Sequence, residues 1–529
     1  MTDSKPKSTS IGLFGGTKKD FSKKIYTVPS KTVERTANVQ LQVQVKPVAP
    51  LRLGKNGLPK LNGAARKSQT PSRSTSRRNS SEPSTAPKSS TVSRTKRTSP
   101  LGSTPTWASD EEDESEARRK RARLDEKATA DTKRQITDKT SFAAEERTEY
   151  DIIHAADIAN NQIQQHGRFQ FEEYFTTTTA DEEDCPTIEL QYPCRSMLER
   201  YSLVKPVDKG DFRPLSEIQD NMQIVSEFYL DEETAEVVAA GEFGGGLVGR
   251  LQKAAKEAAK AGSQSKFVNV IKEYNAILEK KRSDGTIQRS LDNMNQIPLK
   301  LVQHIVKGQI YSRTVSPKVD SVRKYEGFSD NVYGELLPKF LSRIFRETQL
   351  KSDQIFVDLG SGVGNCVLQA ALEIGCESWG CEVMKNPATL AEASAREFPS
   401  RCKMWGIKPG AVHLYQDDFA SNISIREILK KADVVLVNNQ AFTPELNDKL
   451  KYIFLDLKED CQIVSLKYFR DPLHKVKETN INDPVNVLRV SEKERFSGMV
   501  SWSDDPGKWY LQVKDMSELR AVQRRIERA

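Results

Sequence analysis

The stretch from 355 to 365 constrains the fold most, because it joins a strand, a glycine turn and a helix start. Its sequence is Ile-Phe-Val-Asp-Leu-Gly-Ser-Gly-Val-Gly-Asn. The apolar run 355–359 predicts a strand, and the apolar residues within 366–374 predict a buried helix. Glycines between the two let the backbone approach an adenosine-type ligand, since no Cβ stands in the way. The stretch therefore predicts an α/β fold with a ligand site at the turn. The alternative is a plain strand-to-helix turn in another α/β fold.

The spacing of the glycines indicates the kind of ligand. Gly360, Gly362 and Gly364 form GxGxG, whereas a dinucleotide site has GxGxxG, and no Lys-Ser or Lys-Thr follows as in a phosphate-binding loop. Asp358 ends the strand just before the turn. A carboxylate at this point suits a cationic ligand without phosphates, so S-adenosylmethionine (AdoMet) is the cofactor that we expect.

Strands and helices alternate after the glycine turn, which predicts a parallel, doubly wound sheet. We expect further strands at 378–383, 412–415, 433–437 and 461–466. Helices are expected at 387–405, 423–430 and 444–457, and an amphipathic helix at 335–347 precedes the first strand. The segments 485–490, 498–502 and 509–513 follow without clear helices, and we predict that they are antiparallel edge strands.

The charge of the chain is uneven. Residues 1–100 contain 21 Lys and Arg against 4 Asp and Glu, a charge of +17, whereas residues 101–529 contain 60 against 69, a charge of −9. A basic tail on an acidic body is typical of an arm that binds nucleic acid, although a solvated linker without a partner is the alternative. The basic cluster at 118–123 is a candidate signal for nuclear import.

The composition also divides the chain into four predicted parts. Residues 1–135 are rich in Ser, Thr, Pro, Lys and Arg, which predicts a disordered basic tail. Residues 136–195 are a partly ordered linker. Residues 196–325 form a small helical lobe, because an apolar stripe at helical spacing runs through 267–277. Residues 326–520 are the AdoMet-binding core. The glycine-rich stretch 241–249 is interpreted as a flexible connection, since no strand precedes it.

The cysteines and histidines do not indicate a metal site. The chain has 7 cysteines and 5 histidines, none of which are paired at the spacing of metal ligands. We therefore expect no metal and a reducing compartment. The chain has neither a secretory signal nor an apolar run that approaches the ~18 residues needed to span a bilayer, so we expect a soluble intracellular protein.

Four polar or aromatic residues lie where predicted strands end, which is the edge at which such sheets bind ligands. Glu382 follows Asp358 by 24 residues and can accept hydrogen bonds from both ribose hydroxyls. Asp418 can accept from the adenine amino group, and Phe419 can stack on the ring. Asn438 ends the fourth strand, where the transferred methyl group is expected.

These residues closely resemble the Disruptor-of-telomeric-silencing family, the histone H3 lysine methyltransferases that lack a SET domain. The resemblance covers about residues 195–520, and a basic N-terminal extension is similar to the fungal layout. It is carried by Val332-Tyr333-Gly334-Glu335, Val357 to Asn365, Glu382, Asp418-Phe419, Val437-Asn438-Asn439 with Phe442, and Ser501-Trp502.

The resemblance implies the fold, the reaction and the substrate. The fold is that of a class I AdoMet-dependent methyltransferase. The substrate is a lysine in the globular core of histone H3, presented on the nucleosome, and the role is in chromatin and telomeric silencing. We expect a nuclear, monomeric enzyme whose tail binds DNA.

The resemblance also implies the site residues. Tyr333 to Leu336 form a loop over the cofactor, and Asn438 and Phe442 border a narrow lysine channel. Gln440 and Trp509 depart from the family pattern, since a phenylalanine and a channel tyrosine are expected there. The predicted catalytic residues are Tyr333, Asn438, Phe442, Trp509 and Tyr510. The predicted cofactor-binding residues are Tyr333, Gly334, Glu335, Leu336, Phe356, Val357, Asp358, Leu359, Gly360, Ser361, Gly362, Val363, Gly364, Asn365, Glu382, Asp418 and Phe419.

Two rival functions are compatible with the same fold. A class I methyltransferase that acts on nucleic-acid amino groups usually has Pro-Pro-aromatic after the fourth strand, where this chain has Asn438-Asn439-Gln440. The second rival, a chromatin-binding module with an inactive catalytic fold, is disfavoured by the intact Asp358 and Glu382.

Overall fold

The computed structural model describes residues 26–27, 131–142, 151–164, 171–176, 186–194, 198–208, 211–241, 244–322 and 334–528. The predicted import cluster at 118–123 and most of the predicted tail lie outside these residues. Among the described residues, no helix is both long enough and apolar enough to cross a bilayer.

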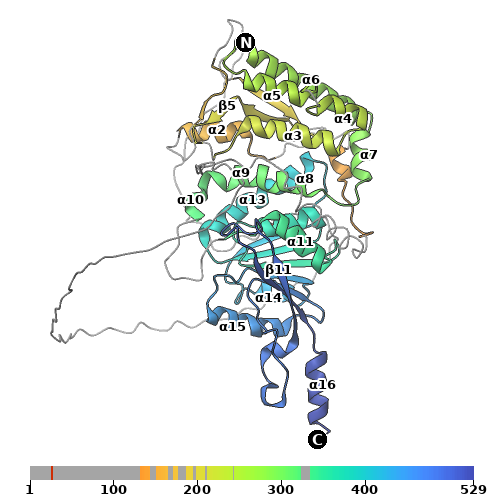
Figure 1. Ribbon diagram of the computed structural model, residues 1–529, viewed down its shortest axis with the longest axis vertical. Helices are drawn as coiled ribbons and strands as arrows, with labels where there is room; N and C mark the ends of the chain where they lie inside the picture. Colours follow the sequence, from red (N-terminus) through yellow and green to blue (C-terminus); the bar gives the residue numbers. More distant parts are fainter. Residues whose placement is uncertain are drawn as a thin grey trace, which may run out of the picture. The chain divides into compact units, whose positions relative to one another are not determined.

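An eight-stranded sheet forms the centre of the C-terminal half (Figure 1), with the strand order β1-β8-β7-β6-β9-β10-β12-β11. Its five central strands, which are β8, β7, β6, β9 and β10, are parallel to one another. β12 is antiparallel to β10 and β11, and β1 is antiparallel to β8 at the other edge. The strands are β1 (Tyr26–Thr27), β6 (Ile355–Leu359), β7 (Glu377–Glu382), β8 (Val412–Gln416), β9 (Val434–Val437), β10 (Gln462–Ser465), β11 (Leu488–Arg495) and β12 (Gly507–Lys514).

Helices cover both faces of this sheet because its central strands are apolar on both sides. Val357 and Leu359 of β6 pack into one core with the helices α14 to α16, whereas Phe356 packs into another core with α11. The helices of this half are α11 (Pro338–Thr348), α12 (Asn365–Gln369), the π-helix η4 (Ala370–Ile374), α13 (Lys385–Met404), α14 (Ile423–Leu429), α15 (Pro444–Ile453), η5 (Phe454–Asp456), η6 (Glu478–Asn480), η7 (Pro484–Val487) and α16 (Ser517–Ile526).

A second layer of helices precedes the sheet and shares a core with α12 and α13. Its helices are α3 (Pro214–Phe228), α4 (Glu232–Val238), α5 (Leu247–Lys256), α6 (Ser263–Ser283), α7 (Thr286–Asp292), α8 (Leu299–Gln303), the π-helix η2 (His304–Tyr311), α9 (Ser312–Thr314), η3 (Ser316–Lys318) and α10 (Val319–Val322). The apolar stripe of α6 is buried, with Phe267, Val270 and Tyr274 at most 2% exposed.

The segment before this lobe packs against both halves. It contains η1 (Lys139–Phe142), α2 (Ala155–Gln164) and two small antiparallel sheets, which are β2 (Phe171–Glu173) with β5 (Val204–Pro206), and β3 (Thr187–Gln191) with β4 (Leu198–Ser202). Arg134 donates hydrogen bonds to the carbonyls of Leu372 (3.0 Å) and Lys408 (2.7 Å). Residues 131–135 and the strand β1, both within the predicted tail, therefore lie on the folded unit.

The predicted doubly wound, mostly parallel sheet with antiparallel edge strands is confirmed. One predicted edge strand is wrong. Residues 498–502 form no strand, and only Val500 makes an isolated bridge, to Leu336. The turn at Gly498, with φ of 65°, explains the difference, because it ends the extended backbone between β11 and β12.

Candidate active site

A cavity opens at the carboxyl ends of β6, β7 and β9. This is the edge at which open α/β sheets bind ligands. It is lined by Gly334, Glu335, Leu336, Asp358, Gly360, Ser361, Gly362, Val363, Asn365, Cys366, Glu382, Val383, Met384, Pro387, Phe419, Leu436, Asn438, Phe442 and Leu446. The lining comes from five separate chain segments, which are 334–336, 358–366, 382–387, Phe419 and 436–446.

The glycine turn forms the floor of the cavity. Gly360 has φ of 86° and Gly364 has φ of 84°, a backbone conformation that side chains disfavour. A Cβ on Gly360 would lie 3.4 Å from Cζ of Phe442. Glycine here keeps the backbone open to the cavity and lets the Phe442 ring pack against it.

Both carboxylate oxygens of Glu382 are held by the backbone. The N–H of Gly362 donates to Oε2 (2.9 Å), and the N–H of Met384 donates to Oε1 (2.8 Å). Burial raises the pKa of Glu382, and these two hydrogen bonds partly offset the effect of burial. Each oxygen keeps lone pairs that can accept hydrogen bonds from a ligand's hydroxyl groups.

Asp358 is a buried acid at the end of β6. Burial raises its pKa to about 7, although a hydrogen bond with the Cys366 thiol lowers it and the charge of Glu382 raises it further. Burial and the charge of Asp358 in turn raise the pKa of Cys366 well above its ordinary value, so this thiol stays protonated. A cation in the cavity would favour the ionised form of Asp358.

The segment 334–336 lines the cavity and is held at three points. The side-chain amide of Asn438 donates to the carbonyl of Gly334 (3.0 Å). The N–H of Glu335 donates to Oγ of Ser501 (2.9 Å), and the N–H of Ser501 donates back to the carbonyl of Glu335 (2.9 Å). A Cβ on Gly334 would lie 2.6 Å from the Trp502 ring, so only glycine allows this approach.

Two rings stand side by side at the β8 end of the cavity. Phe419 and Phe442 are stacked, with 6.5 Å between their centroids and 25° between their planes. They offer a flat apolar surface next to Glu382, as a nucleoside base requires.

The lining residues fit AdoMet. Oδ1 of Asn438 and Nδ2 of Asn365 are buried without a hydrogen-bond partner, although buried polar atoms are normally paired. Three carboxylates line the cavity, those of Glu335, Asp358 and Glu382, which suits a ligand with a sulfonium and an ammonium group. The unpaired atoms and the carboxylates together indicate a polar cationic ligand.

The structure brings most of the predicted site residues to this cavity, but not all of them. Tyr333 lies outside the described residues. Phe356, Val357 and Leu359 are buried in the sheet and point into the cores. Gly364 and Asp418 do not line the cavity. Asp418 is exposed, and its Oδ1 accepts from the N–H of Ala420 (2.9 Å) at the turn before α14.

Trp509 and Tyr510 do not line the cavity either. Trp509 is fully buried, lies 5.8 Å from the Phe340 ring, and donates its indole N–H to the carbonyl of Glu494 (3.1 Å). Tyr510 points to the opposite face of β12, where its ring packs edge-on against Tyr468. The side chains of a strand alternate between faces, so two consecutive aromatic residues cannot both border one channel.

Six residues of the lining are not among those predicted from the sequence: Cys366, Val383, Met384, Pro387, Leu436 and Leu446. Val383 and Met384 directly follow Glu382 at a strand end, and that position could have indicated them. Leu446 could not have been found in this way, because the course of the loop between β9 and α15 decides its place. In the described part of the chain, no group of three or more His, Cys, Asp or Glu residues is arranged to hold a metal ion.

Comparison with known proteins gives matches of three kinds, which are a family model, relatives in sequence and solved structures. Residues 311–514 match the family model described as "Histone methylation protein DOT1". The chain is 46% identical over 404 residues to the "Histone-lysine N-methyltransferase, H3 lysine-79 specific" of Emericella nidulans. The aligned residues make up 76% of this chain and 77% of that protein. The protein of the same name from Yarrowia lipolytica is 38% identical over 367 residues, 69% of this chain and 74% of that one. Among solved structures, an RNA methyltransferase from Salinibacter ruber in complex with S-adenosyl-L-homocysteine matches 34% of this chain and 94% of its own, with 18% identity and a TM-score of 0.22.

Proposed function

Because this chain belongs to the DOT1 family of histone methylation proteins, it is an AdoMet-dependent histone H3 lysine methyltransferase, and we propose that its substrate lysine lies in the globular core of H3 on the nucleosome. The relatives' names specify lysine 79 of H3, and we assign the same lysine to this chain. The observation that supports the proposal most is the cavity itself, where carboxylates from β6 and β7 face Asn438 of β9 across a glycine turn.

The order of the strands suggests how the chain holds the cofactor. Glu382 would accept from the ribose hydroxyls, and the Phe419 ring, from the neighbouring strand end, would pack on the base. Asp358 and the loop at 334–336 lie on the other side, next to β9, and would hold the methionine end. The AdoMet-binding fold is of class I, and Asn438 would border the place where the cofactor supplies its methyl group.

The substrate amine must be neutral before it can accept a methyl group. AdoMet supplies an electrophilic sulfonium methyl. A lysine with a pKa near 10.4 is almost fully protonated at pH 7, and deprotonation costs about 4–5 kcal/mol. Phe442 and Asn438 border the channel in our proposal, and an apolar wall lowers the lysine pKa by desolvation. The Cys366 thiol remains protonated, and no histidine is among the residues that line the cavity. In our proposal the lysine proton leaves to water.

This mechanism predicts a rate that rises with pH in the alkaline range. Single-turnover methylation of nucleosomes between pH 7 and 10 measures it, because chemistry is then separated from product release. A rate that stays constant over this range, with chemistry shown to be limiting, contradicts proton loss to water.

The test of the function compares three substrates for AdoMet-dependent methyl transfer, which are nucleosomes, free histone H3 and DNA. We expect transfer to nucleosomes and little to the other two, since the lysine is presented by the assembled particle. Transfer to DNA alone would favour the nucleic-acid methyltransferase. AdoMet binding without any transfer would favour the inactive chromatin-binding module.

We also propose a nuclear, monomeric enzyme with a role in silencing, whose basic tail contacts DNA. The cluster at 118–123 supports nuclear import, and the charge of +17 in residues 1–100 supports contact with phosphates.

A further inference from the structure

The π-helix η2 carries a lysine that reaches the loop over the cavity. Lys307 forms an ion pair with Glu335, whose carboxylate lines the cavity. Its ammonium group also lies 3.9 Å from the centroid of the Tyr311 ring. The side chains of Lys307 and Glu335 are 25% and 11% exposed, so the pair is largely shielded from water and less screened than a surface pair.

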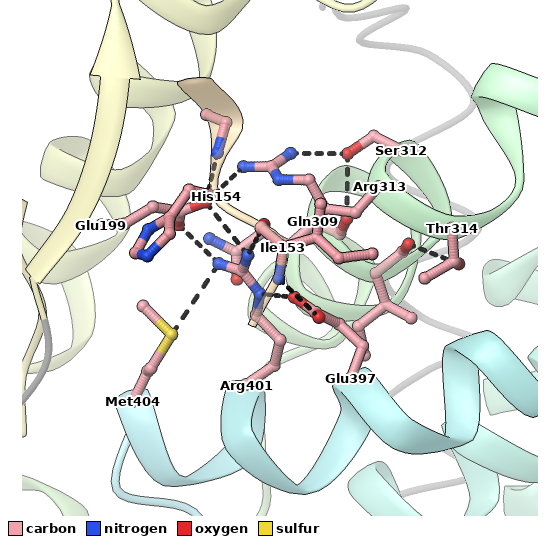
Figure 2. A network of polar contacts seen from close by, with 12 residues as sticks. Ile153, His154, Glu199, Gln309, Ser312, Arg313, Thr314, Glu397, Arg401 and Met404 are labelled. Carbon is pink, nitrogen blue, oxygen red and sulfur yellow. Dashed lines mark hydrogen bonds and ion pairs between the residues drawn. The ribbon is translucent and has the colours of Figure 1, made fainter. Parts of the chain in front are cut away.

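The other side of η2 is anchored in a buried polar network. Gln309 donates from Nε2 to the hydroxyl of Tyr192 (2.7 Å) and accepts at Oε1 from the indole N–H of Trp405 (2.8 Å). Figure 2 shows Arg313, in α9 directly after η2, facing Glu199 of β4, which also pairs with Arg401 of α13. These contacts fix the rotation of η2 about its axis.

The fixed rotation determines where Lys307 points. Residues two apart in a helix lie on nearly opposite sides, so anchoring Gln309 in the network directs Lys307 toward the cavity. Short π-helical segments occur frequently at functional sites, because the change of helical register redirects a side chain. Here the redirected side chain meets Glu335, whose backbone is already tied to Ser501.

The ion pair controls the orientation of a carboxylate rather than the total charge of the site. The methionine end of AdoMet carries one ammonium and one carboxylate, and its net charge is zero. The direction in which the Glu335 carboxylate points therefore decides whether it attracts the ammonium or repels the carboxylate. Without Lys307, the Glu335 carboxylate would lose the cation that pairs with it from η2, and its direction relative to these two groups would change.

We propose that Lys307 is a positioning residue of the methyltransferase. It holds Glu335 so that the loop at 334–336 accepts the amino-acid end of the cofactor, and the helical lobe thereby contributes to cofactor affinity. This inference depends on the proposed function, because it requires the cofactor to bind in the cavity.

The test measures the binding of two ligands by calorimetry to the full chain. S-adenosylhomocysteine has the amino-acid end but no sulfonium charge, and 5′-methylthioadenosine lacks the amino-acid end. We expect Lys307→Met to weaken S-adenosylhomocysteine about tenfold, within the usual range of coupling between neighbouring sites, and to change methylthioadenosine less than about twofold. Lys307→Arg keeps the charge, and we expect it to restore binding to within about threefold.

Two further variants serve as controls. Lys281→Met removes a lysine of similar exposure, 20%, from its pair with Asp231 on the same lobe, and neither ligand should be affected. In a Glu335→Gln background, Lys307→Met should weaken S-adenosylhomocysteine much less than in the wild type, because the partner charge has already been removed.

The outcomes separate the inference from the function. Equal weakening of both ligands by Lys307→Met, or no weakening, overturns the positioning role while the wild type still binds. If Lys307→Met does not fold, the Glu335→Gln variant tests the role instead. If this variant binds S-adenosylhomocysteine as tightly as the wild type does, the positioning role is overturned. If the folded wild type binds neither ligand, the proposed function itself fails.

Discussion

Asp358 lines the cavity as a buried acid, and burial raises its pKa to about 7. Below pH 7 the Asp358 carboxyl group is therefore mostly protonated in the ligand-free protein. A cationic ligand must displace this proton before it meets a carboxylate. We expect AdoMet affinity to fall as the pH decreases from 7.5 to 5.5, approaching about tenfold per unit at the acid end. Calorimetry in two buffers of different ionisation enthalpy should show proton release on binding.

Glu373 provides a matched control for this prediction. Burial raises its pKa to about 7 as well, but its carboxylate accepts from Ser342 and Gln369 and does not line the cavity. Asp358→Asn should weaken binding and remove the pH dependence, whereas Glu373→Gln should leave both unchanged. Persistence of the pH dependence in Asp358→Asn would show that another group is responsible.

Single residues at strand ends could be predicted from the sequence, whereas residues on strands needed the structure. Asp358, Glu382 and Asn438 follow apolar runs, and the end of each run places them at the cavity. The resemblance to the family predicts Trp509 at the position of a channel tyrosine, but the alternation of β12 turns its side chain into the core. Whether a strand residue faces the site depends on the register of the sheet, which a single sequence does not contain.

At the scale of elements, the buried network joins β4, α9 and α13 through one acid. Glu199 accepts from Arg313 (2.9 Å), from both terminal nitrogens of Arg401, and from the N–H of Ala155 (3.2 Å). All three charged side chains are fully buried (Figure 2). Burial alone would raise the pKa of Glu199, but Arg401 and Arg313 outweigh burial and hold it well below its usual range.

Glu199→Gln should destabilise the fold by about 3–5 kcal/mol, because the amide nitrogen would face donors and leave buried charges poorly paired. Urea denaturation at pH 7 measures this loss. Glu273→Gln, which breaks an exposed pair with Arg250, should cost less than about 1 kcal/mol. If both variants have the same stability, the network does not hold these elements together.

The pH dependence of stability provides a second measurement on the same variants. An acid with a lowered folded pKa contributes stability above its unfolded pKa of about 4.3 and loses it as the pH falls below that value. The wild type should therefore lose stability more steeply below pH 4 than Glu199→Gln does.

The periodicity of the sequence predicted most elements of the sheet, since β6, β9 and their neighbours are short apolar runs between helices. It did not indicate η2, because a π-helix has nearly the same apolar spacing as an α-helix over two turns. Nor did it indicate the network, whose members Glu199, Arg313 and Arg401 are separated by more than 80 residues and appear in the sequence as ordinary surface charges.

At the scale of the whole molecule, the folded unit begins earlier than the composition suggested. Arg134 contacts the core, and Thr137 bridges to Ile407 in the segment before β8. The α2 N-terminus donates to Glu199. A chain that begins at residue 196 would lack these contacts and leave the partners of Glu199 exposed, whereas a chain that begins at 131 keeps them. Deletions that probe the tail should therefore begin after β1, which pairs with β8, and end at residue 130.

The tail and the folded unit have opposite charge, and this difference predicts their separate roles on the nucleosome. Residues 101–529 carry −9 and should be repelled by DNA, so the +17 of residues 1–100 must supply the attraction to phosphates. Each phosphate neutralised contributes about 0.9 to the slope of log affinity against log salt. Deleting residues 31–130, which keeps β1 at the edge of the sheet, should reduce this slope by several units and leave the AdoMet affinity unchanged. Replacing only the 9 Lys and Arg of residues 65–100 by Ser keeps the length of the tail, and it should give an intermediate slope. An unchanged slope after the deletion would place the DNA contacts on the folded unit instead, and the basic extension would then be a solvated linker.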